Sequence, residues 1–102
     1  MTRNDTVGTH KTTVHNTGTV ISVIYHETEV VHANRVIGII TLDSGGYRTS
    51  TTKARMNQAA NQFNLGFLVY QKAGEWYVTL NPGTVTQRFE DGMRFPIYTE
   101  EH

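Results

Sequence analysis

The sequence predicts an α+β fold, in which a small curved antiparallel sheet or partly open barrel of about five strands carries one short helix between the third and fourth strands. Three observations lead to this class. Short segments rich in β-branched and aromatic residues recur along the chain, one segment repeats apolar residues at helical spacing, and threonine, which favours strands, occurs 16 times in 102 residues. A chain of this length fits one domain.

Residues 1–18 are polar and weakly patterned. We expect this segment to be flexible in part, or to add an edge strand near Val14, and we expect a single domain over residues 19–102. Its beginning lacks the apolar stretch of a signal peptide, and no apolar run approaches the roughly 20 residues that cross a bilayer. Cysteine is absent, which suits a reducing compartment. These features predict a soluble protein of the cytoplasm without a membrane partner.

The first half of the chain contains three predicted strands. Two of them, at residues 19–26 and 29–33, are separated by a tight reversal near Glu27. The third, at residues 35–42, is apolar almost throughout, so we expect it to lie centrally in the sheet with both faces buried. Within it, Gly38 indicates a bulge or a close approach of another segment.

A double-glycine turn at residues 43–46 leads into a helix predicted over residues 51–63. A hydroxyl side chain suits the N-cap, which we expect to be Ser50 or Thr51. A left-handed residue is expected to end the helix, either Asn64 or Gly66.

The predicted helix has one apolar stripe, which we expect to face the core and which consists of Met56, Ala59, Ala60 and Phe63. The other side is basic and rich in amides, and we expect it to face outward; its residues are Lys53, Arg55, Asn57, Gln58, Asn61 and Gln62. This outward side is therefore a candidate contact surface.

The segment after the helix predicts a β-hairpin that turns at Ala73 and Gly74. A two-residue loop there places Tyr70 opposite Tyr77. Alternation along the strands predicts a core face with Phe67, Val69, Trp76, Val78 and Leu80, and an opposite face with Leu68, Tyr70, Lys72, Glu75, Tyr77 and Thr79. After a turn at residues 81–83, two weak strands at residues 85–89 and 93–98 are expected to finish the sheet, joined across residues 90–92.

Charge and motifs exclude several functions. Acids and bases balance at nine each, so the whole protein has no field that attracts a polyanion. The sequence Asp43-Ser44-Gly45-Gly46 occurs around the nucleophile of chymotrypsin-type proteases, but those enzymes need about twice this length, and we interpret it as a turn. His26 and His32 could meet across a hairpin, yet no third metal ligand is indicated. We therefore predict no enzyme, no metal and no cofactor.

Two tyrosines on the face of a hairpin opposite the core suggest a binding surface. Aromatic rings within a basic surround are used by proteins that bind single-stranded nucleic acid, because bases stack on rings while cations contact phosphates. The residues of this candidate site are Arg48, Lys53, Arg55, Tyr70, Lys72 and Tyr77. The alternative is that the helix or a partner subunit covers this face and buries the tyrosines.

The segment from Gly46 to Val78 resembles short proteins encoded by tailed-phage and marine viral genomes. The residues that carry the resemblance form a glycine-aromatic turn, a Thr-Thr-Lys sequence with Arg, Met and Asn after it, and a hairpin with Gln-Lys and Trp-Tyr: Gly46, Tyr47, Thr51, Thr52, Lys53, Arg55, Met56, Asn57, Gln71, Lys72, Trp76 and Tyr77. The likeness covers about a third of the chain. It implies a viral origin and action inside the host cell, and brings no established activity.

A weaker resemblance in architecture is to Sm-like and other SH3-like small barrels. The chain departs from the Sm pattern because its predicted helix follows the third strand and the Arg-Gly signature of the second Sm motif is missing. RNA binding inferred from this architecture is an analogy only. From the tyrosine-bearing basic surface and the viral resemblance, we expect a viral accessory protein without enzymatic activity that binds RNA or single-stranded DNA. The alternative is a module for protein contacts, either a homo-oligomer or an inhibitor of a host protein.

Overall fold

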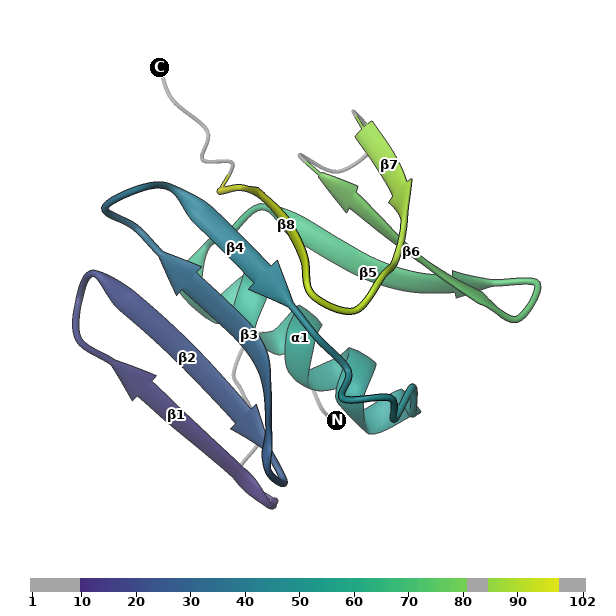
Figure 1. Cartoon of the computed structure of the whole chain (residues 1–102), viewed down its shortest axis with the longest axis horizontal. Helices are drawn as coiled ribbons and strands as arrows, with labels where there is room; N and C mark the ends of the chain where they lie inside the picture. Colours follow the sequence, from purple (N-terminus) through teal and green to yellow (C-terminus); the bar gives the residue numbers. More distant parts are fainter. Residues whose placement is uncertain (1–9, 81–84, 98–102) are drawn as a thin grey trace.

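A computed structural model describes residues 10–80 and 85–97, which form two antiparallel sheets and one helix (Figure 1). The larger sheet has the strand order β1-β2-β3-β4-β8, and the smaller has the order β5-β6-β7. The elements are β1 Thr12–Asn16, β2 Val20–Tyr25, β3 Thr28–Asn34, β4 Ile39–Leu42, α1 Ser50–Phe63, β5 Phe67–Lys72, β6 Glu75–Leu80, β7 Val85–Arg88 and β8 Met93–Pro96. The predicted α+β class is confirmed, but the strands divide between two open sheets.

Strand β1 is an edge strand of the larger sheet and contains Val14, where the sequence suggested such a strand. It precedes β2, so α1 follows the fourth described strand of the chain and not the third. The remainder of the predicted N-terminal segment, residues 1–9, lies outside the described residues.

The prediction of a strand over residues 35–42 is wrong for its first half. Only β4 is extended, and residues 35–38 form a turn in which Val36 and Ile37 are 74% and 61% exposed. The side-chain oxygen of Asn34 accepts hydrogen bonds from both of their backbone N–H groups, at 2.9 and 3.3 Å. This local capping outweighs the β propensity of the two residues. Gly38 has a φ of 73° and ends the turn, so it marks no bulge.

Helix α1 begins one residue before the predicted start. Its N-cap is Thr49, and not Ser50 or Thr51, because the Thr49 hydroxyl accepts from the backbone N–H of Thr52 at 3.2 Å. Asn64 ends the helix in the left-handed conformation, as one of the two predicted alternatives. The predicted apolar stripe is buried throughout.

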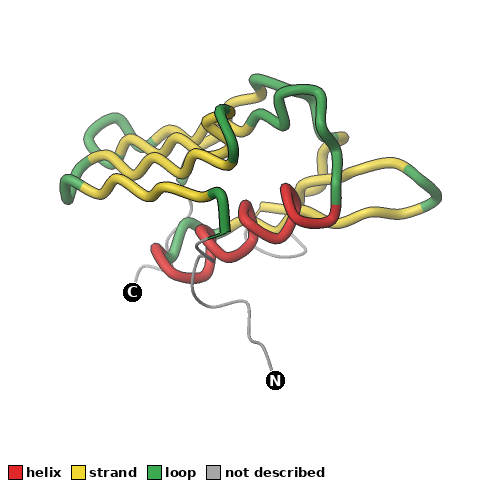
Figure 2. The backbone as a smooth tube through the Cα atoms, turned by 90° about the horizontal axis from the view of Figure 1, so that it is seen from below, coloured by secondary structure: helices red, strands yellow, loops and turns green. Residues whose placement is uncertain are grey.

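The helix lies beneath one face of the larger sheet, and the smaller sheet continues beside it (Figure 2). Its contacts with β2, β3 and β5 place it against both sheets. Side chains of the two sheets meet directly where the Phe67 ring of β5 packs edge-on against the Phe95 ring of β8, with 5.6 Å between centroids. One hydrophobic core therefore joins the two sheets and the helix.

Asn57 of α1 binds the edge of β5 as a neighbouring strand would. Its side-chain oxygen accepts from the Val69 N–H at 2.7 Å, and its side-chain nitrogen donates to the Val69 carbonyl at 2.8 Å. Both backbone groups point away from β6, because Val69 and Val78 form a non-hydrogen-bonded pair. The spacing assigned Asn57 to the side of the helix away from the apolar stripe, and its side chain binds the β5 backbone there instead of solvent.

The prediction that the last two strands pair with each other is also wrong. Strand β7 pairs with β6 and β8 pairs with β4, so the chain crosses from one sheet to the other between them. The crossing is anchored by Asp91, whose Oδ1 accepts from the N–H and hydroxyl of Ser44 at 2.7 and 2.6 Å. The N–H of Gly92 donates to the Leu42 carbonyl. The predicted turn at residues 81–83 lies outside the described residues.

Replacing Asn57 tests the role of the helix as an edge cap. We expect Asn57→Ala to lower the free energy of unfolding by about 3 kcal/mol, because the Val69 N–H and carbonyl lose their partners. Alanine has the higher helix propensity, so a loss cannot come from the helix itself. Asn57→Asp, which retains an acceptor for the N–H alone, should be intermediate in urea denaturation. Equal stability of Asn57→Ala and the parent would contradict the capping role.

The hairpin turn offers a second stability test. Ala73 and Gly74 have φ of 54° and 82°, so alanine occupies a left-handed position of the predicted two-residue turn. We expect Ala73→Asn to raise the free energy of unfolding by about 1 kcal/mol, since asparagine tolerates this conformation. The melting temperature should rise by about 4–8 °C. The matched variant Ala73→Val should lower it, and a rise with valine would refute the explanation.

Candidate nucleic-acid surface

The two tyrosines of the hairpin pair as predicted and lie on the side of the smaller sheet opposite the buried Trp76. Tyr70 and Tyr77 stack with 5.7 Å between ring centroids and 27° between ring planes, and both are half-buried. The register of β7 places Arg88 opposite Tyr77. A row of two rings and a guanidinium therefore crosses the three strands.

We call the face that carries this row the outer face of the smaller sheet. By register its residues are Leu68, Tyr70, Lys72, Glu75, Tyr77, Thr79, Thr86 and Arg88. The Arg88 guanidinium donates to the Glu75 carboxylate at 2.7 Å. Leu68 is 42% exposed at the other end of the face, whereas Thr79, on the same face, is buried. The predicted division of hairpin faces agrees with the structure.

Arg48 and Lys53 lie on the other side of the hairpin. The Arg48 guanidinium is 4.9 Å from the centroid of the Phe89 ring and its Nη2 is 3.8 Å from a carboxylate oxygen of Asp91. The ammonium of Lys53 is 5.8 Å from the Trp76 ring centroid and donates to the Gln71 side chain at 3.3 Å. Because Trp76 and Gln71 alternate with the tyrosines, these two cations face away from the tyrosine pair.

Arg55 was predicted to face outward, and this prediction is wrong. It is 9% exposed, donates through Nε to the Thr12 hydroxyl at 2.8 Å and through Nη1 to the Gln58 side chain at 3.1 Å. Its guanidinium also lies 5.7 Å from the centroid of the Tyr25 ring. It fixes the helix to the larger sheet. Gln58, also predicted outward, is buried beside it.

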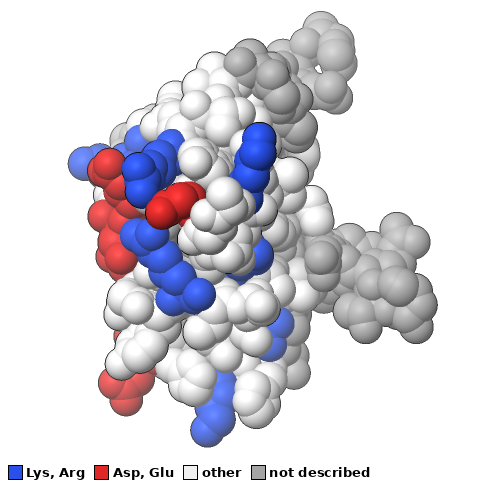
Figure 3. All heavy atoms as spheres, turned by 90° about the vertical axis from the view of Figure 1, so that its right-hand side faces the viewer, with Lys and Arg blue, Asp and Glu red and all other residues white. Residues whose placement is uncertain are grey.

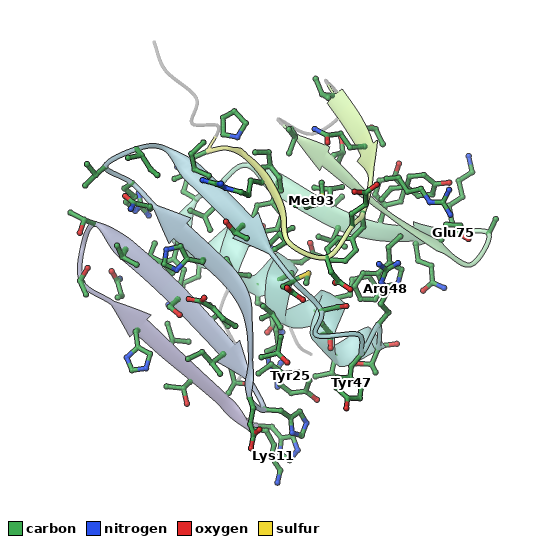
Figure 4. All side chains as sticks on the ribbon, viewed as in Figure 1. Lys11, Tyr25, Tyr47, Arg48, Glu75 and Met93 are labelled. Carbon is green, nitrogen blue, oxygen red and sulfur yellow. The ribbon has the colours of Figure 1, made fainter. Side chains whose placement is uncertain are left out.

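The six predicted site residues therefore divide among three places. Tyr70, Tyr77 and Lys72 share the outer face, two cations lie across the hairpin, and one is buried. Figure 3 shows Lys, Arg, Asp and Glu mixed on the end of the molecule that carries the hairpin tip. Figure 4 shows Arg48 and Glu75 at the same end of the molecule, although they lie on opposite sides of the hairpin. The predicted basic surround is thus partly neutralised by acids.

Arg88 completes the row across the outer face, and sequence reasoning missed it. The sequence did place Arg88 in a predicted strand, residues 85–89. That strand was expected to pair with residues 93–98, whereas it pairs with β6. The correct pairing became visible only through the three-dimensional position of Phe89, whose N–H donates to the Trp76 carbonyl and whose ring packs edge-on against the indole.

A separate cavity of about 760 Å³ lies where the β2–β3 turn, the loop before α1 and the first turn of α1 meet. Its lining residues come from four segments: Lys11, Tyr25, His26, Glu27, Thr28, Val30, Ser44, Tyr47, Thr49 and Thr52. Figure 4 shows Lys11, Tyr25 and Tyr47 gathered on this side of the molecule. The chemistry is mixed, with two phenol rings, hydroxyls, a lysine and a glutamate. No sequence motif indicated this cavity.

The histidine pair considered as a metal site is separated. His32 Nδ1 lies 2.9 Å from a Glu29 carboxylate oxygen, whereas the His26 ring packs against Tyr25. No group of three metal-binding side chains occurs among the described residues. Partial burial alone would raise the pKa of Glu29, but hydrogen bonds from Ser22 and His32 and the charge of His32 outweigh it, so its pKa lies below its ordinary value.

The fold and the outer face define a small, mostly antiparallel α+β protein with an aromatic and charged strand surface. The model of the Kyanoviridae Gp96 protein family matches residues 1–96. The chain therefore belongs to the Kyanoviridae Gp96 family and is a phage protein, which agrees with the viral origin implied by the resemblance. Comparisons with curated proteins and with solved structures give no match. In the described part of the chain, no helix has the length and apolar character needed to span a bilayer.

The burial of Arg55 gives a prediction that separates structural from exposed cations. We expect Arg55→Ala to lower the free energy of unfolding by about 2 kcal/mol, because Thr12 and Gln58 lose a charged hydrogen-bond donor. The matched variant Lys72→Ala, at an exposed position, should change it by less than about 0.5 kcal/mol. Chemical denaturation measures both, and an Arg55→Ala protein as stable as Lys72→Ala would show that Arg55 is not structural.

Proposed function

We propose that the protein binds single-stranded nucleic acid, without catalysis, through the outer face of the smaller sheet. The observation that supports the proposal is the row of Tyr70, Tyr77 and Arg88 across three adjacent strands. The helix and core cover the opposite face, so the rings rest on a fixed support. Bases stack on such rings with little dependence on sequence.

The charges on this face predict weak attraction of phosphates. Lys72 and Arg88 are the cations of the face, and Glu75 pairs with Arg88. A bound phosphate would compete with Glu75 for the guanidinium. With about two phosphate contacts, log K should fall with log salt at a slope near −1.4. Stacking should therefore supply much of the affinity.

Arg48 and Lys53 are not part of this proposed surface, since they lie on the other side of the hairpin. Arg55 is excluded because it is buried. The proposed site thus retains three of the six residues predicted from sequence, Tyr70, Lys72 and Tyr77, and adds Arg88. A viral accessory role in the host cytoplasm is the setting that we propose, consistent with a phage family.

Alanine substitution of the tyrosines tests the proposal. We expect Tyr70→Ala and Tyr77→Ala each to weaken binding of a labelled single-stranded oligonucleotide about tenfold, because each removes a stacking contact worth about 1–3 kcal/mol. Fluorescence anisotropy with DNA and RNA oligonucleotides of mixed sequence measures the loss. Tyr47→Ala is the matched control, since Tyr47 is 71% exposed and lies outside the face. Equal loss with Tyr47→Ala, or no binding by the parent, would refute the proposal.

The second candidate function is contact with a host protein through the same outer face. The exposure of Leu68 beside the tyrosine pair favours it, because apolar and aromatic side chains with an arginine are typical of protein interfaces. Leu68→Ser distinguishes the two functions. It should leave oligonucleotide affinity nearly unchanged if bases stack on the tyrosines, and should weaken a protein complex strongly if that is the ligand.

A further inference from the structure

The two open sheets have four edges, and the pairing registers show which backbone groups point outward at each. Directly before β1, the Lys11 carbonyl accepts a hydrogen bond from the His26 N–H. By alternation, the backbone groups of Thr13 and His15 in β1 therefore also bond to β2. The N–H and carbonyl groups of the other residues, Thr12, Val14 and Asn16, therefore point away from the sheet. No strand among the described residues pairs with that side of β1.

Two of the other edges are closed or blocked. The edge of β5 is capped at its middle by Asn57. In β8, the N–H of Ile97 donates to the Gly38 carbonyl, so the outward positions are Arg94 and Pro96. One carries a charge and the other has no backbone donor, and both features discourage pairing with a further strand.

The edge of β7 is short. The hydrogen bond from the Phe89 N–H to the Trp76 carbonyl places Thr86 and Arg88 at its outward positions. One of these two is again charged, whereas β1 has three outward positions and neither a charged residue nor a proline. Among the four described edges, β1 alone has outward backbone positions without a charged residue, a proline or a side-chain cap.

We propose that a second copy of this chain pairs with β1, antiparallel, about a two-fold axis at Val14. In this register Val14 lies opposite its own copy and Thr12 lies opposite Asn16 of the other copy. All outward groups are then paired by about six backbone hydrogen bonds. A shift in either direction leaves some of them without partners, so the edge itself selects the register. The two five-stranded sheets become one continuous sheet.

The side chain of Val14 supports the same register. Val14 lies opposite the fully buried Val23, so it is on the core side of the sheet, yet it is 38% exposed because the sheet ends there. In the paired dimer the two Val14 Cα atoms are about 5.5 Å apart, and each side chain covers the other. A C2 dimer uses one patch twice, as this arrangement requires.

Single cysteine variants test the register, because the chain has no cysteine of its own. We expect Val14→Cys to form an oxidised dimer in high yield on a non-reducing gel, since a separation of about 5.5 Å suits a disulfide. Thr13→Cys should form little, because its Cα atoms would be about 8 Å apart, beyond the limit of about 7 Å. Val85→Cys, on the exposed edge of β7, measures random collision. Cross-linking of Val85→Cys as fast as Val14→Cys would overturn the proposal.

Sedimentation of the full-length chain tests the association itself. We expect a mass near twice the 11.5 kDa of one chain for the parent, and a shift to the monomer for Val14→Lys and for Val14→Glu, which place like charges at the axis. An equimolar mixture of the two variants should return to the dimer. A parent that remains monomeric at millimolar concentration would refute the proposal. Dispersal by Tyr77→Ala and not by Val14→Lys would instead locate the contact on the outer face, a result independent of oligonucleotide binding.

Discussion

The pair of hydrogen bonds between Asn57 and the backbone of Val69 is the contact on which the arrangement of the two sheets depends. One helix must pack under the larger sheet and also beside β5, whose edge backbone groups would otherwise lie buried without partners. An amide side chain offers one donor and one acceptor at the spacing of a peptide unit, so Asn57 takes the place of a strand. The helix can therefore close a sheet edge while its apolar stripe fills the core.

The same arrangement fixes which side of the hairpin is available for binding. Trp76 packs against Phe89 in the core, and alternation then places Tyr77 on the opposite side. Asp91 anchors the crossing that brings Phe89 beneath the hairpin, through its bonds to Ser44. The orientation of the outer face thus follows from contacts made on the core side, between residues up to 47 positions apart in sequence.

Features set by short-range physics were predictable from the sequence. The hairpin register followed from a two-residue turn, and the helix stripe followed from its spacing; both are observed. Residues 35–38 were predicted wrongly because the Asn34 side chain, a local competitor, outweighed the propensity of apolar residues. The burial of Arg55 and the pairing of β7 with β6 were predicted wrongly for a different reason. Each depends on contacts between segments that the apolar periodicity of a single segment cannot indicate. Of the six residues predicted for the site, Tyr70, Tyr77 and Lys72 therefore lie on one face, whereas Arg48, Lys53 and Arg55 do not share it.

A chain of 102 residues buries only about two-thirds of its unfolded surface, so its edges are a large part of what it presents to other molecules. Three of the four described edges are protected from pairing. The Asn57 amide caps β5, β8 has Arg94 and Pro96 at its outward positions, and β7 is short and has Arg88. The edge of β1 lacks these features and exposes Val14, which continues the core row of β2. An uncharged edge strand can pair with further chains without limit unless the assembly is closed. Antiparallel pairing about Val14 is closed after two copies, because each copy has one such edge. The protected edges and the single open edge therefore together limit the proposed association to two copies.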